Sequence, residues 1–172
     1  MVAGGLTPCE SNVKRRASDM RGYFHAEING SDPLVYETYE RDVPHVPGEL
    51  VENITVIYPG TVDGEYFMTK GHYHENSHSA EVYLCLSGEG RLLMESEDGD
   101  WEMLTMTPGT TVHVPPAWAH RSANVGSTPL IIYALYPADA GHNYARIAEF
   151  GFTRRLLQGE DNNPRLVLRE RR

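Results

Sequence analysis

The feature that most limits the fold is a series of short segments in which apolar and polar residues alternate. Such alternation is typical of β-strands, and the Pro-Gly, Asp-Gly and Gly-rich stretches between the segments favour turns. The sequence predicts strands at 34–39, 52–58, 65–69, 81–87, 90–96, 101–106, 110–114, 119–125 and 130–136. Many short strands without helices between them indicate an all-β sandwich or small barrel.

The two ends of the chain differ from this β-rich middle. We expect residues 1–14 to form a tail, and Ser18 and Asp19 to cap one short helix. The barrel core is predicted at about 34–138, followed by a short helix and C-terminal strand region over 139–172. Gly151 would stop that helix, and residues 165–168 would form an edge strand or a contact with a partner. With no internal repeat, residues 1–172 are predicted to be a single domain.

Composition argues against several classes of function. The net charge is −9, and the basic runs at 14–16 and 169–172 are interpreted as solvated ends, so we expect no nucleic-acid partner. No run approaches the ~20 apolar residues of a membrane span, and we expect no membrane association. The first residues do not have the pattern of a secretory signal. Cys9 and Cys85 lie far apart, which predicts reduced thiols and a cytoplasmic location.

Three histidines and one glutamate are candidate metal ligands. His72 and His74 are two residues apart, so on a strand they would point to the same face. Glu81 opens the following strand, and His120 lies in a later strand that could return beside the first pair. This mixed set of nitrogen and oxygen donors suits Fe²⁺, Mn²⁺, Ni²⁺, Co²⁺ or Zn²⁺, and relative affinity alone does not choose among them.

Each of these residues also has an ordinary structural interpretation. An isolated His-x-His is more often a surface or core feature, and a lone glutamate is usually solvated. The specificity comes from the combined spacing, which continues with Gly88, then Pro108-Gly109, and then His120 and Asn124. Alternation places Tyr83 on the same face as Glu81, and it predicts that Arg121 faces outward. Four other histidines receive no role: His25, His45, His78 and His113.

These motifs resemble the cupin family, whose members are double-stranded β-helix (jelly-roll) barrels. Four segments resemble more specifically the cupin-type phosphoglucose isomerases: GHYH (71–74), AEVYLCLSGEG (80–90), PGTTVHVPPAWAHRSANVG (108–126) and YPADAGHNYARIAEFGF (136–152). The resemblance implies a jelly-roll barrel with short flanking helices. It also implies a metal-dependent aldose–ketose isomerase of glycolysis and gluconeogenesis, which interconverts glucose 6-phosphate and fructose 6-phosphate.

The same resemblance implies roles for individual residues. One divalent ion per subunit, with Fe²⁺ preferred, would be held by His72, His74, Glu81 and His120. The sugar phosphate would be surrounded by Tyr36, Thr55, Thr69, Gly71, Tyr83, Tyr136 and His142, of which Tyr36 closes the pocket. Glu81, His142 and Tyr136 would be catalytic, and the assembly would be a homodimer. Thr69 has the wrong strand parity to join His72, so we expect Gly71 to form a bulge that resets the register.

Several alternatives stay open at this stage. The same site could isomerise mannose 6-phosphate, or the chain could be a metal- or sugar-binding cupin without catalysis. Hydrogen could move by proton transfer through an enediol or by direct hydride shift. We favour proton transfer with Glu81 as the carrier. The apolar residues Val82, Leu84 and Leu86 are expected either in a subunit contact or against the second sheet of the barrel.

Overall fold

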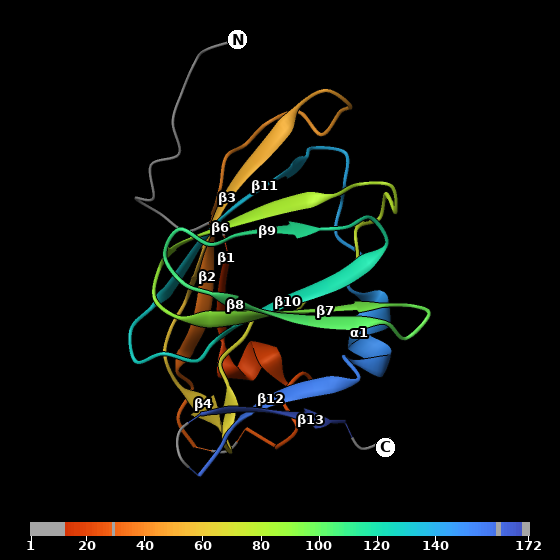
Figure 1. The fold of residues 1–172 in the computed structure, drawn as a ribbon. Coiled ribbons are helices and arrows are strands. Elements are labelled where there is room, and N and C mark those ends of the chain that lie inside the picture. The colour runs from red at the N-terminus through yellow and green to blue at the C-terminus, as the bar shows by residue number, and fades with distance from the viewer. Residues whose placement is uncertain (1–12, 29, 161–162, 170–172) are drawn as a thin grey trace.

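The computed structural model describes residues 13–28, 30–160 and 163–169, which form three antiparallel sheets (Figure 1). The largest has the order β1 (Val13–Arg16), β2 (Leu34–Glu40), β3 (Leu50–Ile57), β11 (Leu130–Pro137), β6 (Glu81–Ser87) and β9 (Thr111–Val114). The second consists of β10 (Trp118–Asn124), β7 (Gly90–Ser96) and β8 (Trp101–Met106). The third consists of β13 (Pro164–Leu168), β12 (Arg154–Gln158), β5 (Glu65–Tyr66) and β4 (Thr61–Val62). The predicted all-β fold is confirmed.

Most predicted strands appear within a few residues of their expected bounds, whereas β1, β4 and β12 were not predicted, and two differences affect the cavity. The strand expected at 65–69 ends at Tyr66, because the chain then leaves the small sheet and runs beside β10. There, the amide of Asn124 donates to the carbonyl of Phe67, and the amide of Thr69 donates to that of Ser122, both at 2.9 Å. The second difference is β1, which begins at Val13, within the last residues of the expected tail. Its pairing with β2 is a long-range contact that local composition does not reveal.

The helices in the described part of the chain are short. The helix expected after Ser18 is the 3₁₀ turn η1 (Ala17–Met20), and the later one is α1 (Ala145–Phe150). Neither is long and apolar enough to cross a membrane. The α1 helix ends as predicted at Gly151, which has a φ of 66° and donates its N–H to the carbonyl of Ile147. β13 is the edge strand of the small sheet, one of the two alternatives for this segment.

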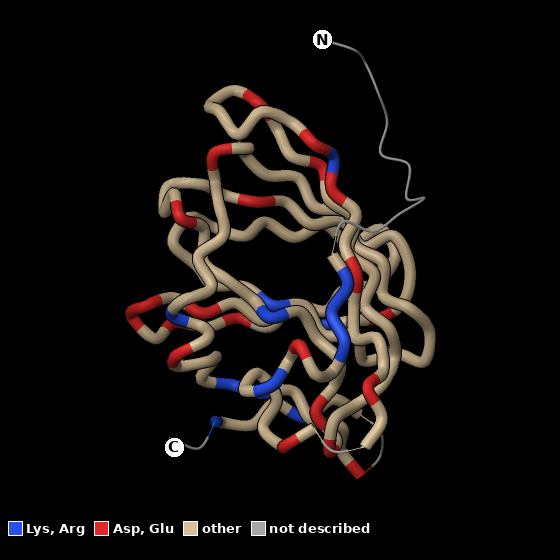
Figure 2. The backbone as a smooth tube through the Cα atoms, turned by 180° about the vertical axis from the view of Figure 1, so that it is seen from behind, with Lys and Arg blue, Asp and Glu red and all other residues tan. Residues whose placement is uncertain are grey.

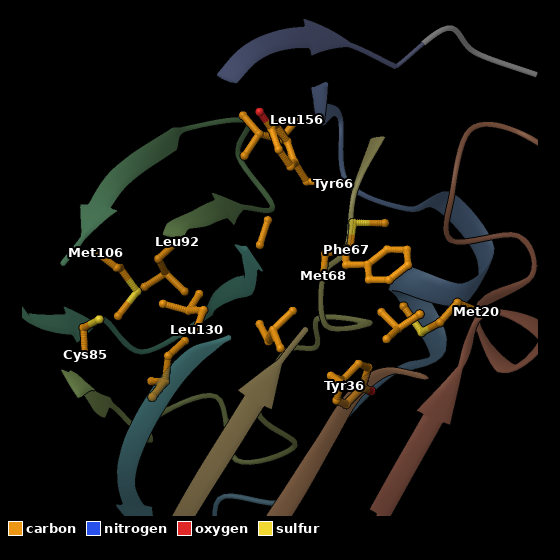
Figure 3. Close-up of a cluster of buried hydrophobic side chains, with 14 of the residues drawn as sticks. Met20, Tyr36, Tyr66, Phe67, Met68, Cys85, Leu92, Met106, Leu130 and Leu156 are labelled. Carbon is orange, nitrogen blue, oxygen red and sulfur yellow. The ribbon is translucent and has the colours of Figure 1, made fainter. Parts of the chain in front are cut away.

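The apolar core fills one part of the barrel and leaves another part polar. Leu92, Met106 and Leu130 are fully buried between the six-stranded sheet and the sheet of β10, β7 and β8 (Figure 3). Along β11 the inward-facing residues then change from Leu130 and Ile132 to Ala134 and Tyr136, and the last three border a cavity. The barrel is therefore packed with apolar side chains on one side and open to a ligand on the other.

Candidate metal centre

The four predicted metal ligands converge in the barrel. One ligand atom from each of His72, His74, Glu81 and His120 can be chosen so that all four lie within 4.8 Å of one another. His72 belongs to the segment beside β10 and pairs through its backbone with His120. Glu81 begins β6, and its Oε2 lies 2.9 Å from Nε2 of His120 and 3.3 Å from Nε2 of His74. Three separate segments thus bring their donors to one point.

Hydrogen bonds from His74 and His120 to backbone carbonyl oxygens determine which nitrogen of each ring faces the centre. Nδ1 of His74 lies 3.1 Å from the carbonyl oxygen of Ser79, and Nδ1 of His120 lies 3.3 Å from that of Trp118. A carbonyl oxygen only accepts, so each Nδ1 carries the hydrogen and each Nε2 presents a lone pair to the centre. This is the usual way in which proteins orient metal-binding histidines.

The centre contains donor atoms that nothing else in the described structure satisfies. Nε2 of His72 and Nε2 of His120 are buried and have no hydrogen-bond partner among the described residues. Although Nε2 of His120 lies 2.9 Å from the Glu81 carboxylate, the direction of approach does not form a hydrogen bond. Two electron-rich atoms at this separation repel each other unless a cation lies between them. The donor set therefore fits a divalent metal ion.

The local electrostatics favour the protonation states that bind a cation at His72 and Glu81, whereas at His74 burial would lower the pKa but hydrogen bonds with Glu81 and Ser79 leave it raised. Burial, followed by the charges of His120, His142 and His74, holds the pKa of His72 well below its ordinary value. Burial alone would raise the pKa of Glu81, but its contacts with His120 and His74 more than offset this and leave that pKa lowered. A neutral imidazole and an ionised carboxylate are the forms that ligate metals.

A bulge at Gly71 brings Thr69 into register with the ligands. Met68 lies opposite Ala123 while His72 lies opposite His120, so one extra residue occurs on this segment. Gly71 has a φ of +74°, a conformation that side chains other than glycine rarely adopt. Thr69 and His72 consequently both border the cavity, as the proposed bulge requires.

The cavity beside the centre has a volume of about 450 Å³. It is bordered by three of the four predicted metal ligands, whereas His74 lies behind them and is buried. All the residues expected around a sugar phosphate border it: Tyr36, Thr55, Thr69, Gly71, Tyr83, Tyr136 and His142. The His142 ring lies 4.4 Å from the His72 ring and 5.5 Å from the Tyr136 ring, so it is close to the metal ligands.

Several cavity residues escaped the sequence analysis. Arg15, Lys70 and Glu40 all border the cavity, and Tyr136 donates a 2.6 Å hydrogen bond to Glu40. The interpretation of residues 14–16 as a solvated end is wrong for Arg15, because β1 turns this side chain inward. Strand alternation within the basic run would have been the signal, had a strand been recognised there. Burial, together with the charge of Arg15, lowers the pKa of Lys70.

The expectation that Arg121 faces outward is correct for the direction of its side chain, but the residue is not exposed. Its side chain does point away from the cavity, but the C-terminal segment covers it and leaves it 4% exposed. The guanidinium lies 4.4 Å from the centre of the Phe152 ring and donates to the carbonyl of Lys70 at 2.7 Å. Burial lowers its pKa to about 10, which leaves it charged at neutral pH. Arg121 and Phe152 thus support the chain directly behind Gly71.

Comparison with known proteins identifies the family. The family model described as "Glucose-6-phosphate isomerase (GPI)" matches residues 15–167. The chain belongs to the glucose-6-phosphate isomerase family. The glucose-6-phosphate isomerase of Pyrococcus furiosus is 47% identical over 150 residues, which cover 84% of this chain and 79% of that protein. The enzyme of the same name from Thermococcus litoralis is 46% identical over 162 residues, covering 91% and 84%. A third, from Sinorhizobium medicae, is 34% identical over 155 residues, covering 86% and 72%.

Solved structures place this isomerase-family chain in the cupin fold. The oxalate decarboxylase of Bacillus subtilis matches with a TM-score of 0.50 and 22% identity, covering 62% of this chain and 26% of that one. Another oxalate decarboxylase structure matches with a TM-score of 0.51 and 21% identity, covering 67% and 28%. This chain corresponds to about a quarter of those proteins. At this identity the similarity shows the jelly-roll fold alone.

Proposed function

We propose that the chain is a metal-dependent isomerase of glycolysis and gluconeogenesis that interconverts glucose 6-phosphate and fructose 6-phosphate. The observation that carries the proposal is the set of four converging donors at the wall of a 450 Å³ cavity, in a chain of this family. A cavity of this size is in the range that binds a small ligand. Sugar hydroxyls and a phosphate would meet the hydroxyl and imidazole groups that border it.

The proposed cofactor is one divalent ion, held by His72, His74, Glu81 and His120. Fe²⁺ is our first choice, and Mn²⁺, Ni²⁺, Co²⁺ and Zn²⁺ suit the same donors. When bound, the ion would act as a Lewis acid on the two oxygens between which the aldose and ketose differ. The support is the pair of buried imidazole nitrogens, on His72 and His120, that lack any other partner among the described residues.

The residues around the centre have complementary proposed roles. Thr55 and Thr69 offer hydroxyls and Gly71 a backbone N–H to substrate oxygens, while Tyr36 borders the cavity from β2. Burial raises the pKa of Tyr83 well above its ordinary value, so its hydroxyl stays protonated and can donate. His142 and Tyr136 lie beside the metal ligands, where we propose that they assist ring opening.

We propose that the carboxylate of Glu81 carries the proton between C2 and C1. One of its oxygens faces His74 and His120, and general-base assistance of this kind is typically worth about 10²–10⁴-fold in rate. Isomerisation in deuterated water tests this step. Deuterium in the product supports proton transfer, whereas full retention of the C2 hydrogen, with turnover preserved in Glu81→Gln, favours a hydride shift.

A coupled assay of fructose 6-phosphate turnover, before and after chelation, tests the overall proposal. We expect activity to fall on metal removal and to return with a divalent ion. The His120→Ala variant should lose metal content and activity together, while His113→Ala, an exposed histidine on β9, should retain both. Full activity in metal-stripped protein would contradict metal dependence. Turnover of mannose 6-phosphate would reveal a side activity, and metal binding without turnover would indicate a binding protein.

We further propose a homodimer located in the cytoplasm. The outer face of β6 supports an assembly, because Val82 and Leu86 are 44% and 46% exposed. These residues face away from the barrel interior, while Cys85 on the opposite face of the strand is a buried free thiol. A reduced thiol is compatible with the cytoplasm.

A further inference from the structure

The three basic residues of β1 face different surroundings. Arg15 borders the cavity, whereas Lys14 and Arg16, its neighbours in sequence, are exposed on the other face of the strand. Nζ of Lys14 lies 3.9 Å from Glu37, and Nη1 of Arg16 donates to the carbonyl of Asp32 at 2.8 Å. Figure 2 shows this basic run in blue at the first described strand. Strand alternation therefore directs one cation of the three toward the cavity.

Lys70 adds a second cation to the same part of the cavity. It immediately precedes the Gly71 bulge, and its Nζ lies 5.1 Å from the centre of the Tyr23 ring, which also borders the cavity. Arg15 is paired in register with Tyr36, another residue of the cavity wall. The two cations and the two tyrosines thus define a cationic end of the cavity.

Neither cation forms an ion pair with a carboxylate within the described part of the chain. Carboxylates lie within 4 Å of Lys14, Arg41, Arg91, Arg146, Arg154 and Arg155, but of neither Arg15 nor Lys70. In addition, Nε of Arg15 is buried without a hydrogen-bond partner among the described residues. Buried donors are normally satisfied, and cations that face each other in a cavity repel. An anion at this position would accept a hydrogen bond from the buried Nε of Arg15 and would offset the repulsion between the two cations.

The opposite end of the cavity is unsuitable for an anion. Glu40 lies at the end of β2, four residues beyond Tyr36, and four residues of strand correspond to about 13 Å. Tyr136 donates a 2.6 Å hydrogen bond to Glu40, and the amide of Asn53 donates to the same carboxylate oxygen at 3.3 Å. A phosphate dianion there would face a carboxylate, so the charges favour one direction of binding along the cavity.

We propose that Arg15 and Lys70 form the phosphate site of the cavity and bind the phosphomonoester dianion of the substrate. This inference rests on the proposed function for the identity of the sugar. The planar guanidinium of Arg15 can donate two parallel hydrogen bonds to a phosphate, while Lys70 contributes a compact charge. Binding in this direction points the phosphate away from Glu40. The local cations also explain how a chain with a net charge of −9 can attract a dianion.

Inorganic phosphate tests the site directly. Binding to the metal-loaded full chain would be measured by calorimetry for the parent and for Arg15→Gln and Lys70→Gln. Hydrogen bonds to charged groups are typically strong enough that we expect each change to weaken phosphate affinity by about 10- to 100-fold. Lys14→Gln is the matched control, since it removes the same charge one residue away on the outer face of β1. It should leave phosphate affinity unchanged.

Conservative variants distinguish binding from structural support. Arg15→Lys and Lys70→Arg keep the charge and should recover part of the lost affinity. Metal content should equal that of the parent in all variants. In the isomerase assay, Arg15→Gln should raise KM for glucose 6-phosphate more than it lowers kcat. Phosphate affinity that is the same in parent, Arg15→Gln and Lys70→Gln would overturn the proposal, as would an equal loss in Lys14→Gln.

The phosphate site and the proposed function can fail separately. A parent protein that binds phosphate through Arg15 but does not isomerise sugar phosphates would contradict the proposed function and leave the phosphate site intact. An active isomerase whose KM is unchanged in Arg15→Gln and Lys70→Gln would contradict the phosphate site alone. Equal loss of metal in both variants would show that the two residues support the fold, and would also overturn the proposal.

Discussion

Glu40 is a carboxylate of the cavity wall that does not belong to the metal-ligand cluster. It accepts a 2.6 Å hydrogen bond from Tyr136, whose ring lies 6.2 Å from that of His74. Burial and the hydrogen bond to Glu40 both raise the pKa of Tyr136, so its hydroxyl remains protonated. The oxygen of that hydroxyl can accept the O1 proton of the cyclic sugar while its own proton passes to Glu40, and the ring oxygen would take up a proton from solvent as the bond between C1 and that oxygen breaks. Glu40 is therefore a positioning residue for the proposed ring opening.

Replacement of Glu40 by Gln should lower kcat by about 10²-fold, because the amide cannot take up the proton. KM and metal content should be unchanged. Glu52→Gln is the matched control, since Glu52 accepts a 2.9 Å hydrogen bond from Tyr133 and neither residue borders the cavity. Steady-state kinetics would check the prediction, with the fall in kcat expected for Glu40→Gln alone. A fall in kcat of the same size in both variants would show a general effect on the sheet.

Local spacing made the metal ligands predictable, whereas the cations depended on long-range contacts. His72 and His74 are two residues apart, so strand parity places this pair on one face, and the spacing of the whole motif adds Glu81 and His120. Arg15 reaches the cavity only because β1 pairs with β2, and nothing within residues 13–16 signals that pairing. Arg121 was misplaced for a related reason. Parity correctly turned it away from the cavity, but it could not show that Phe152 would cover it.

At the scale of elements, the bulge before His72 determines which side chains reach the centre. The strand at 65–69 was predicted too long because β-propensity does not show where a chain changes sheets. An added Cβ at Gly71 would lie 2.6 Å from the Phe152 ring and 2.9 Å from the carbonyl oxygen of His120. Such distances require the neighbouring atoms to move, and one of these neighbours is the backbone of His120, a proposed metal ligand.

The Gly71→Ala variant should therefore be less stable than a glycine-to-alanine variant in which only the backbone conformation is strained. Gly99→Ala supplies that control, because Gly99 has a φ of +94° and no atoms lie within 4 Å of its Cβ position. A left-handed alanine costs about 1–2 kcal/mol in either variant. Overpacking should add about 1–3 kcal/mol at Gly71. Urea denaturation measures both free energies of unfolding, and metal analysis should show loss at Gly71 alone. Equal destabilisation would contradict the packing argument.

At the scale of the whole molecule, the outer face of the largest sheet is the surface that we propose for contact with a partner subunit. Val82 is paired in register with Leu135, and Leu84 with Tyr133, so apolar side chains of β6 and β11 lie next to one another on that face. Leu86 is 46% exposed at the end of β6. Burial of such a surface is typical of stable homodimers. Of the two sequence-based expectations for these residues, the exposure favours a subunit contact.

The Leu86→Glu variant should dissociate the proposed homodimer, because the interface would then bury an unpaired charge. Sedimentation equilibrium at micromolar concentration measures the mass. Phe150→Glu is the control, since Phe150 is 61% exposed on α1, away from this sheet. We expect the parent and the control to be dimers and Leu86→Glu to be a monomer. A monomeric mass for the parent would refute the proposed assembly.

The packing of Phe152 behind Gly71 has a consequence for how each new molecule matures. Ribosomes synthesise the four ligands before they synthesise Phe152, so the donors emerge from the exit tunnel while their support is still missing. Phe152 can pack against the loop before His72 only after its segment has been translated and has docked against Arg121. Nascent chains therefore complete the binding site late. Capture of the cation at full affinity is expected to follow translation of that segment, which ties the maturation of the protein to the folding of its C-terminal part.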